Sequence, residues 1–497
     1  MSDEKYSAET GPGESHQCDR SDAPRTAEGL TDWTIPVIPS TRIDPEDWAW
    51  AHEQRKPVDP DITVDQVAAI LLVHQAAGWL PRALNALRRS GERAAVQIAV
   101  DLGSTDGSSD LLVAAVDEGL LDECVTASAD TTPGEGINLA IDRLSDGVTH
   151  IWILHDDVEV RRDSLTCMLR EASRKPHPDV LYPTLLKPAR HNYPEFIDEQ
   201  GQSVSTGGAR VLPVVDRGDI DQKQADPGPI LGGSTAGMFV RVDVWRRLGG
   251  FDPALPLFRD GVDFGWRANE AGMVVRTAPS CTIHHRQAGR GWQRESHLAP
   301  RPDVTDRLAG MRMVAARTGH PTRTSLALLV ASVWRFLVLM VGKAPSRAVD
   351  EWRSGLQLWR SRSVTREMTQ RLQDFHAQCD PDDLENTNRL LPSRRSVWVR
   401  AVDRYAGDLS DRIHPWRNED GTTIDDLTGD DFTVRDHRSV VNPYTVMVSL
   451  MVVIGIVACR GLYGSGRATS TWLAPAPCGL AGAWHRWLTA VPGLSGG

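Results

Sequence analysis

The sequence has few cysteines, and they lack the spacing of a metal site or a disulfide framework. Seven cysteines are spread over 497 residues, and no two form a CxxC pair, which argues against a zinc ribbon or a disulfide-stapled secreted domain. An excess of basic charge is also missing, because the formal net charge is −11. Nucleic-acid binding relies on a basic surface that displaces counterions from phosphates, so we expect no nucleic acid among the partners.

The N-terminus lacks both the basic and the apolar part of a secretory signal. We therefore expect the first folded domain to stay in the cytoplasm. Residues 1–60 are acidic and rich in Pro, Ser and Gly, a composition that predicts a largely disordered leader.

Apolar runs alternate with helical patterns from Val67 onward. Val67–Val73 reads VAAILLV, a continuous apolar run of strand length, and residues 81–89 have helical apolar spacing. Further apolar runs at 96–100 and 151–154 end at Asp101 and His155. This alternation predicts an α/β fold with a mostly parallel sheet, which binds its ligands beyond the carboxyl ends of the strands.

Residues 67–290 resemble the family-2 glycosyltransferases of the GT-A fold, a Rossmann-like sheet flanked by helices. The opening strand AAILLVH places His74 and Gln75 where such enzymes meet the base and ribose of a nucleotide-sugar donor. Asp101, followed by GSTDGS with Ser104 and Asp106, is similar to the family's second-strand signature. The resemblance implies that these residues bind the nucleotide sugar. A plain strand-helix turn with capping side chains is the alternative.

The segment HDDVEV lies where the family has its metal-binding acidic element. The resemblance implies metal ligation by Asp157 and a nucleotide-sugar contact by Asp156, and it puts His155 where the family usually has aspartate. His285 aligns with a histidine that completes the metal site in some relatives, notably galactofuranosyltransferases. The implied cofactor is a divalent cation, Mn²⁺ or Mg²⁺. Acidic residues after a strand also often cap the following turn.

The acceptor-side segment contains FRDGVDFGWR. The family usually has two adjacent acidic residues here and uses the second as the catalytic base, but these positions are Asp260 and Gly261. Asp260 and, one helical turn on, Asp263 are therefore the candidate bases, although an aspartate near a helix start also interacts favourably with the helix dipole. Arg267 matches a family arginine that braces this motif at the nucleotide-sugar site.

Two apolar segments follow the predicted catalytic domain at residues 61–300. Residues 439–460 are the stronger candidate for a transmembrane helix, because 439–459 contain no charge. Residues 325–342 include Arg335. The following stretch, 343–417, contains 14 Lys and Arg residues, which favours a cytoplasmic location for it. We therefore expect 325–342 to be an in-plane or re-entrant helix within a helical, basic region at 301–438. An ordinary buried helix is the alternative.

These features together predict an inverting, metal-dependent glycosyltransferase of the cell membrane. Its catalytic domain is expected to be cytoplasmic, and its acceptor a lipid-linked or cell-envelope glycan, as for galactofuranosyl and rhamnosyl transferases. The prediction depends on Asp101 and Asp157 facing one cleft. The alternative that Gly261 favours is an inactive sugar-nucleotide-binding scaffold of the same fold. A nucleotidyltransferase fits less well, because HQAAGWLPR at 74–82 is no Gly-rich basic phosphate loop. The tail at 461–497 is rich in Gly, Ala and Pro, and this composition is also compatible with a truncated form of a longer membrane protein.

Overall fold

The computed structural model describes residues 60–188, 194–223, 225–289, 294, 296–341, 344–393, 451 and 454. The predicted leader lies outside the described residues except for residue 60. The predicted transmembrane helix at 439–460 also lies outside them, apart from two positions, as does the tail at 461–497.

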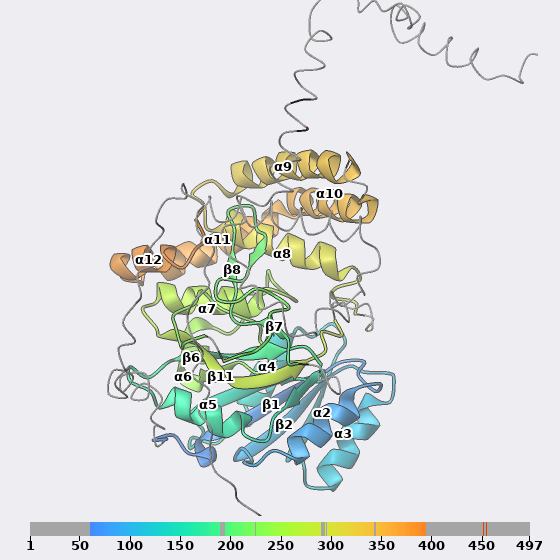
Figure 1. The fold of residues 1–497 in the computed structure, drawn as a ribbon, viewed down its shortest axis with the longest axis vertical. Helices are drawn as coiled ribbons and strands as arrows, with labels where there is room; N and C mark the ends of the chain where they lie inside the picture. Colours follow the sequence, from blue (N-terminus) through green and yellow to red (C-terminus); the bar gives the residue numbers. More distant parts are fainter. Residues whose placement is uncertain are drawn as a thin grey trace, which may run out of the picture. The chain divides into compact units, whose positions relative to one another are not determined.

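Nine strands among the described residues form one mixed sheet (Figure 1). Its order is β3-β2-β1-β4-β10-β6-β11-β5, with β7 beside β6. The pairs β1/β2, β1/β4, β2/β3 and β6/β11 are parallel, while the pairs that involve β10, β5 and β7 are antiparallel. The strands are β1 (Val67–Val73), β2 (Val96–Leu102), β3 (Glu123–Ala127), β4 (His150–His155), β5 (Val158–Val160), β6 (Val180–Leu186), β7 (Ile197–Glu199), β10 (Phe239–Arg241) and β11 (Val275–His285). The mostly parallel α/β arrangement predicted from the sequence is confirmed.

Helices cover both faces of this sheet, which explains why β1 is apolar along its whole length. Alternate β1 residues belong to two different hydrophobic clusters, and all seven residues are buried. One cluster joins β1 to α2 (Leu80–Arg88), α3 (Ser108–Asp117) and α5 (Ser164–Ala172). The other joins it to α4 (Pro133–Ile141), α6 (Val242–Leu248) and α7 (Asp260–Glu270). A strand buried on both faces has no reason to alternate polar and apolar residues.

Strand ends differ slightly from the sequence prediction. β2 continues through Leu102, so Asp101 lies inside the strand, and His155 is the last residue of β4. β3 was not predicted, because this edge strand has only one buried residue and lacks an apolar run. A separate small hairpin, β8 (Ser203–Val204) and β9 (Arg210–Val211), precedes β10.

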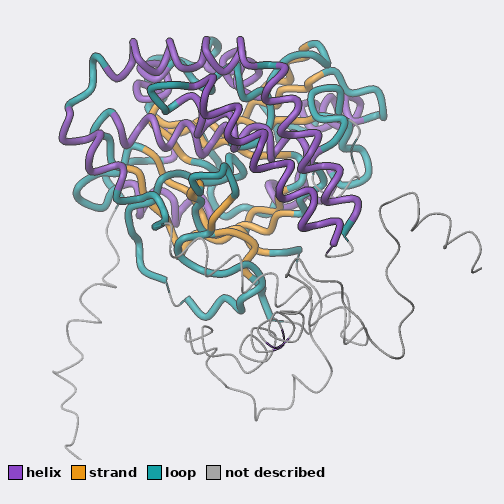
Figure 2. Tube along the Cα trace, turned by 90° about the horizontal axis from the view of Figure 1, so that it is seen from above, coloured by secondary structure: helices purple, strands orange, loops and turns teal. Residues whose placement is uncertain are grey.

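A group of helices follows the sheet and packs on α7. These helices are α8 (Pro302–Ala316), α9 (Pro321–Val341), α10 (Pro345–Arg360), α11 (Arg362–His376) and α12 (Pro381–Asn388). A hydrophobic cluster links Trp266 of α7 to Met313 of α8 and Met368 of α11. In Figure 2 these helices (purple) lie in front of the strands (orange). Helix α7 therefore lies between the sheet and the C-terminal helices.

Candidate active site

A cavity of about 170 Å³ opens at the carboxyl ends of β1 and β4. Its wall includes His74 after β1, His155 at the end of β4, Asp260 at the start of α7 and His285 at the end of β11. β1 and β4 are parallel, and their register pairs Leu72 with His155. The cavity therefore lies at the edge where a mostly parallel sheet is expected to bind its ligands.

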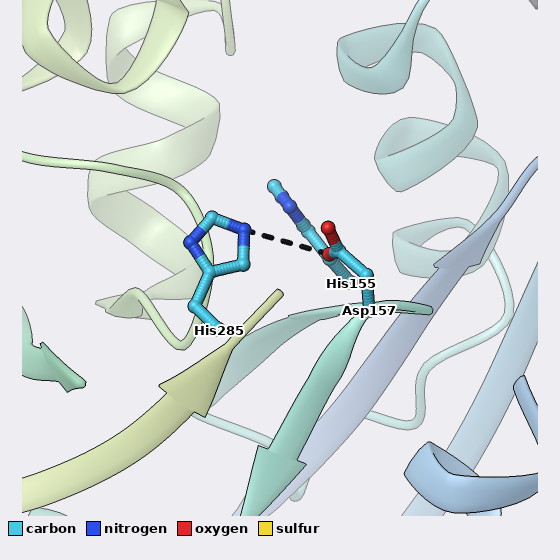
Figure 3. Close-up of side chains that lie close together, drawn as sticks. All are labelled: His155, Asp157 and His285. Carbon is cyan, nitrogen blue, oxygen red and sulfur yellow. Dashed lines mark ion pairs between the residues drawn. The ribbon is translucent and has the colours of Figure 1, made fainter. Parts of the chain in front are cut away.

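Three side chains able to ligate a metal meet in this cavity (Figure 3). They are His155, Asp157 and His285, whose ligand atoms all lie within 4.8 Å of one another. The Nε2 atom of His285 is 3.5 Å from Oδ1 of Asp157. The antiparallel pairing of β11 with β5, in which His285 lies opposite Val158, brings this histidine to the turn after β4. The structure thus brings together all three predicted metal ligands.

Burial and the Asp157 carboxylate shift the pKa values of the two histidines in opposite directions. Burial lowers the pKa of His155 to about 4, so its ring is neutral at neutral pH, as a metal ligand must be. Burial opposes the charged form of His285, but the Asp157 carboxylate outweighs it and raises the pKa of His285. Burial likewise opposes the charged form of Asp157, yet His285 and Arg294 lower its pKa. Nδ1 of His285 is buried with no hydrogen-bond partner. Two imidazoles and a carboxylate fit Mn²⁺ better than Mg²⁺, which prefers oxygen ligands.

Asp156 has a different environment from its neighbour Asp157. It is 1% exposed and accepts hydrogen bonds from the backbone N–H of His74 (2.9 Å) and from Nε1 of Trp79 (3.2 Å). It also pairs with Arg294, whose guanidinium lies 5.4 Å from the Trp79 ring centroid. Asp156 does not line the cavity, whereas Arg294 does. In the structure Asp156 holds the end of β1 and Arg294 in place. Its contact with the nucleotide sugar stays a prediction.

The GSTDGS turn is held by its own polar side chains. Asp101 is 1% exposed and accepts hydrogen bonds from the backbone N–H of Ser104 (3.0 Å) and from a serine hydroxyl of α3. The hydroxyl of Ser104 accepts the backbone N–H of Gln75 at 3.0 Å, and Asp106 accepts a backbone N–H of the same loop at 2.8 Å. The turn is therefore joined to the loop after β1.

This arrangement corrects the expectation that Asp101 and Asp157 both face the cleft. Asp157 lines the cavity, but Asp101 does not, because its carboxylate is used inside the turn. Leu102 and His74 line that side instead, and Nδ1 of His74 lies 2.8 Å from the Leu102 carbonyl oxygen. Gln75, Ser104 and Asp106 also lie outside the cavity wall. Their roles in nucleotide-sugar binding stay predictions.

The two candidate bases lie in different environments. Asp260 lines the cavity, and burial raises its pKa to about 6. Asp263 is fully buried away from the cavity and pairs with Arg267 (2.8 Å) and Arg317 (3.0 Å). Arg267 also donates to the carbonyl oxygens of Leu248 and Gly250 rather than reaching the cavity. Of the two aspartates, only Asp260 can meet a ligand in the cavity.

No protein-family model matches the chain. Over 253 residues the chain is 26% identical to N-acetylglucosaminyl-diphospho-decaprenol L-rhamnosyltransferase of Mycobacterium tuberculosis, a match that covers 47% of this chain and 81% of the relative. The chain is a homologue of glycosyltransferases. The resemblance stated from the sequence and its glycosyl-transfer class agree with this relative.

Solved glycosyltransferase structures are also similar, at low scores. GalNAc-T7 with UDP, GalNAc and Mn²⁺ matches with a TM-score of 0.40 and 12% identity over 51% of this chain and 51% of that chain. A mannosyltransferase from Pyrobaculum calidifontis, in complex with GDP-Man and Mn²⁺, matches with a TM-score of 0.38 and 16% identity over 63% of this chain and 92% of that chain. At these scores individual site residues are not matched between the structures.

Packing explains why this chain has Gly261 where the resemblance leads one to expect a second acidic residue. A Cβ atom at this position would lie 2.5 Å from the carbonyl oxygen of Gly233 and 2.8 Å from Cγ2 of Thr235. The Tyr182 hydroxyl also donates a hydrogen bond to the Gly261 carbonyl oxygen at 2.8 Å. The first turn of α7 thus lies directly against the backbone before β10. No side chain fits at residue 261, and the Asp260 carboxylate faces the cavity instead.

Several residues of this cavity were not identified from the sequence. They are Glu199, Gln202, Arg210, Thr235 and Arg259. Four of them lie in short strands, turns and loops between β7 and α7, where apolar periodicity is weak. Glu199, at the end of β7, is a charged residue that the fold buries. Its charge is visible in the sequence, but its burial is not.

We predict that Gly261→Ala destabilises the protein by about 1–3 kcal/mol, the usual cost of overpacking, despite the higher helix propensity of alanine. Gly78→Ala is the matched control, because a Cβ atom at Gly78 meets nothing within 4 Å. Its expected effect is within about 0.5 kcal/mol. Urea unfolding of the two variants measures the difference. Equal stability of Gly261→Ala and the parent chain would contradict this account of the packing.

Proposed function

We propose that this chain is an inverting, metal-dependent glycosyltransferase. It would transfer a sugar from a nucleotide-sugar donor to a lipid-linked or cell-envelope glycan at the cytoplasmic face of the cell membrane. The observation that carries the proposal is one cavity bordered by His155, Asp157 and His285 on one side and by Asp260 on another. The rhamnosyltransferase relative, whose name specifies a diphospho-decaprenol-linked substrate, supports the acceptor class.

The donor half of the cavity is built for a diphosphate. A divalent cation held by His155, Asp157 and His285 would neutralise the charge that develops on the departing nucleoside diphosphate. Arg294 lines the same cavity, held by Asp156 and by the Trp79 ring. A guanidinium group pairs well with phosphate oxygens. These residues would orient the donor and stabilise the leaving group.

The acceptor half depends on Asp260. The acceptor hydroxyl would give its proton to the Asp260 carboxylate, while its oxygen forms a bond to the anomeric carbon of the donor sugar. The bond from that carbon to the diphosphate oxygen breaks, and its electron pair leaves with the diphosphate. One displacement of this kind inverts the anomeric centre. Asp260 forms no ion pair with any side chain that the structure describes, which leaves its carboxylate available as the base.

The alternative is a scaffold that binds sugar nucleotides without turnover. Its supporting observation is Gly261 in place of the usual base. Two features favour the enzyme instead: packing excludes a side chain at Gly261, and the adjacent Asp260 is buried at the cavity wall with a raised pKa. Perturbed pKa values of this kind are common in catalytic groups.

We predict that the full-length protein releases nucleoside diphosphate from at least one nucleotide sugar in Mn²⁺ or Mg²⁺ and that a membrane lipid extract stimulates the release. Asp260→Asn should lower the rate by about 10²–10⁴, the usual contribution of a general base. Asp157→Ala should weaken Mn²⁺ binding at least about 10-fold. Asp110→Ala, on the exposed side of α3, is the control and should match the parent chain. Donor binding without turnover for every sugar and acceptor would favour the scaffold.

A second prediction concerns the pH dependence of transfer. Burial raises the pKa of Asp260 from the ordinary 3.8 to about 6. The base acts only when ionised, so kcat/KM should rise with pH through about 6 and level off above it. Asp260→Asn should remove this rising limb from its residual activity. A profile that is flat between pH 5 and 7 in the parent chain would exclude Asp260 as the base.

A helix beside the catalytic unit supports the proposed membrane location. Among the described residues, α9 is the one helix long and apolar enough to cross a membrane, and 17% of its most apolar window is buried. Its exposed apolar side chains lie at helical spacing on one face: Leu326, Val330, Val333, Trp334, Leu337, Val338 and Met340. Its opposite face packs on α10 (Figure 1), where Ser332 meets Gly355 and Arg335 pairs with Glu351. We therefore propose that α9 lies in the plane of the membrane rather than spanning it.

We predict that a photo-crosslinking amino acid at position 334 of the full-length chain reacts with phospholipid in vesicles of phosphatidylglycerol and phosphatidylcholine. The same group at position 332, on the protein-facing side, should crosslink to α10 instead. Position 88 on the exposed end of α2 is the control and should give no lipid adduct. Lipid adducts at 332 as strong as those at 334 would favour a spanning helix, and none at 334 would exclude contact with lipid.

A further inference from the structure

A cluster of four charged side chains, two buried and two partly buried, lies beside Asp260 and has no part in the chemistry described so far. Arg259 binds Asp306 through two nitrogens, with Nε–Oδ1 at 2.7 Å and Nη2–Oδ2 at 3.0 Å. Arg210 joins the same Asp306 (2.8 Å) and also Glu199 (3.2 Å). Both arginines and Glu199 line the cavity. Asp306 belongs to α8, so the C-terminal helices hold these arginines in place.

Each arginine keeps one buried nitrogen without a hydrogen-bond partner. These atoms are Nη1 of Arg259 and Nε of Arg210, in side chains that are 2% and 17% exposed. A buried donor left unpaired costs free energy. Arg312 also has such a nitrogen but lies away from the cavity, so the position of Arg259 and Arg210 in the cavity wall is what distinguishes them. Because both side chains line the cavity, a ligand there can supply the missing acceptors.

The backbone before α7 is strained in a way that sets the position of Arg259. Phe258 and Arg259 are consecutive residues with φ of 63° and 59°, a left-handed conformation that side-chain-bearing residues seldom adopt. Such strain is tolerated where surrounding contacts enforce it and is common at functional sites. Here the two hydrogen bonds to Asp306 and the close packing of Gly261 enforce it. The result is a guanidinium group adjacent in sequence to the proposed base.

We propose that Arg259, assisted by Arg210, binds a phosphate of the acceptor, so that this enzyme selects sugars linked to their carrier through phosphate. This inference rests on the proposed function and names the acceptor class. A guanidinium fork matches phosphate oxygens, and charge-assisted hydrogen bonds of this kind are strong. The donor diphosphate has its own partners in the histidine-aspartate cluster and Arg294. With Asp260 at the reacting hydroxyl, Arg259 would hold the phosphate at the carrier end of the same sugar.

Asp306 and Glu199 determine how strongly this site attracts an anion. They balance the charge of the two arginines, so the cluster can stay buried without its ligand. Removing one carboxylate should leave a surplus positive charge facing the cavity. Loss of Arg259 and loss of Asp306 should therefore change phosphate binding in opposite directions, although either change removes part of a buried ion pair. A purely structural role for the cluster predicts the same direction for both.

Calorimetry on the full-length protein tests this inference, because binding is measured apart from turnover. The probes are N-acetylglucosaminyl diphosphate on a short prenyl chain and the octyl glycoside of the same sugar, which has no phosphate. The parent chain should bind the phosphorylated probe more tightly. Arg259→Met should raise the Kd of that probe about 10- to 100-fold and leave the Kd of the octyl glycoside and of the nucleoside diphosphate unchanged. Asp306→Asn should lower the Kd of the phosphorylated probe.

Arg312→Met is the matched control. Arg312 is also buried, but it donates to the Ala254 carbonyl oxygen and to Ser361 and does not line the cavity. Its substitution should leave the affinity for both probes unchanged. Thermal melting of each variant verifies that it is folded.

The outcomes separate this inference from the proposed function. Equal affinity of the parent chain for both probes, or a Kd for the phosphorylated probe that rises in both Arg259→Met and Asp306→Asn, would overturn the phosphate site. A raised Kd for the nucleoside diphosphate in Arg259→Met would assign the arginine to the donor and also overturn it. Selective binding of the phosphorylated probe without turnover of any donor would support the phosphate site while refuting the transferase.

Discussion

The hydrogen bonds of one buried carboxylate, Asp156, fix the edge of the sheet on which the site is built. It accepts the backbone N–H of His74 and so ties the end of β1 to the turn after β4, and it also holds Trp79 and Arg294. Because this carboxylate is used inside the protein, its neighbour Asp157 is the one that faces the cavity and meets His285. A single tight turn therefore supplies one carboxylate that anchors the strand and one at the cavity, whose Oδ1 lies beside His285 while its Oδ2 accepts the backbone N–H of Ala288.

The other half of the site depends on how closely α7 approaches the loop before β10. Gly261 allows backbone contact with Gly233, and this contact holds Asp260 at the cavity wall. Arg317, at the end of α8, supports the helix from the far side through Asp263 and lies 4.0 Å from the Trp266 ring centroid. The helices that include the apolar face of α9 are thus rigidly joined to the helix with the proposed base.

Much of the fold and part of the site could be predicted because their signals are local. The apolar run of β1 and the polar residues at the ends of β2 and β4 indicated the parallel sheet and the edge where the cavity lies. His155, Asp157 and His285 were predicted from the resemblance to a family, and the structure brings them together. Asp101 shows the limit of this reasoning. Its position near the end of β2 was predicted to within one residue, but whether its oxygens face the cleft or the GSTDGS turn depends on nearby backbone N–H groups that no pattern reveals.

The sequence by itself determined which residues could do chemistry, since strand ends, acidic pairs and helix starts follow from short-range periodicity. Only the tertiary structure decided which of them share a cavity. Asp260 and Asp263 were both candidate bases from the sequence, with Asp260 the nearer to the expected position. The folded protein buries Asp263 among arginines and leaves Asp260 at the cavity. Arg259 and Arg210 gained significance only through Asp306, which belongs to a helix that follows the whole sheet. Contacts between segments far apart in sequence form only when the hydrophobic core packs, so local secondary-structure propensity does not predict them.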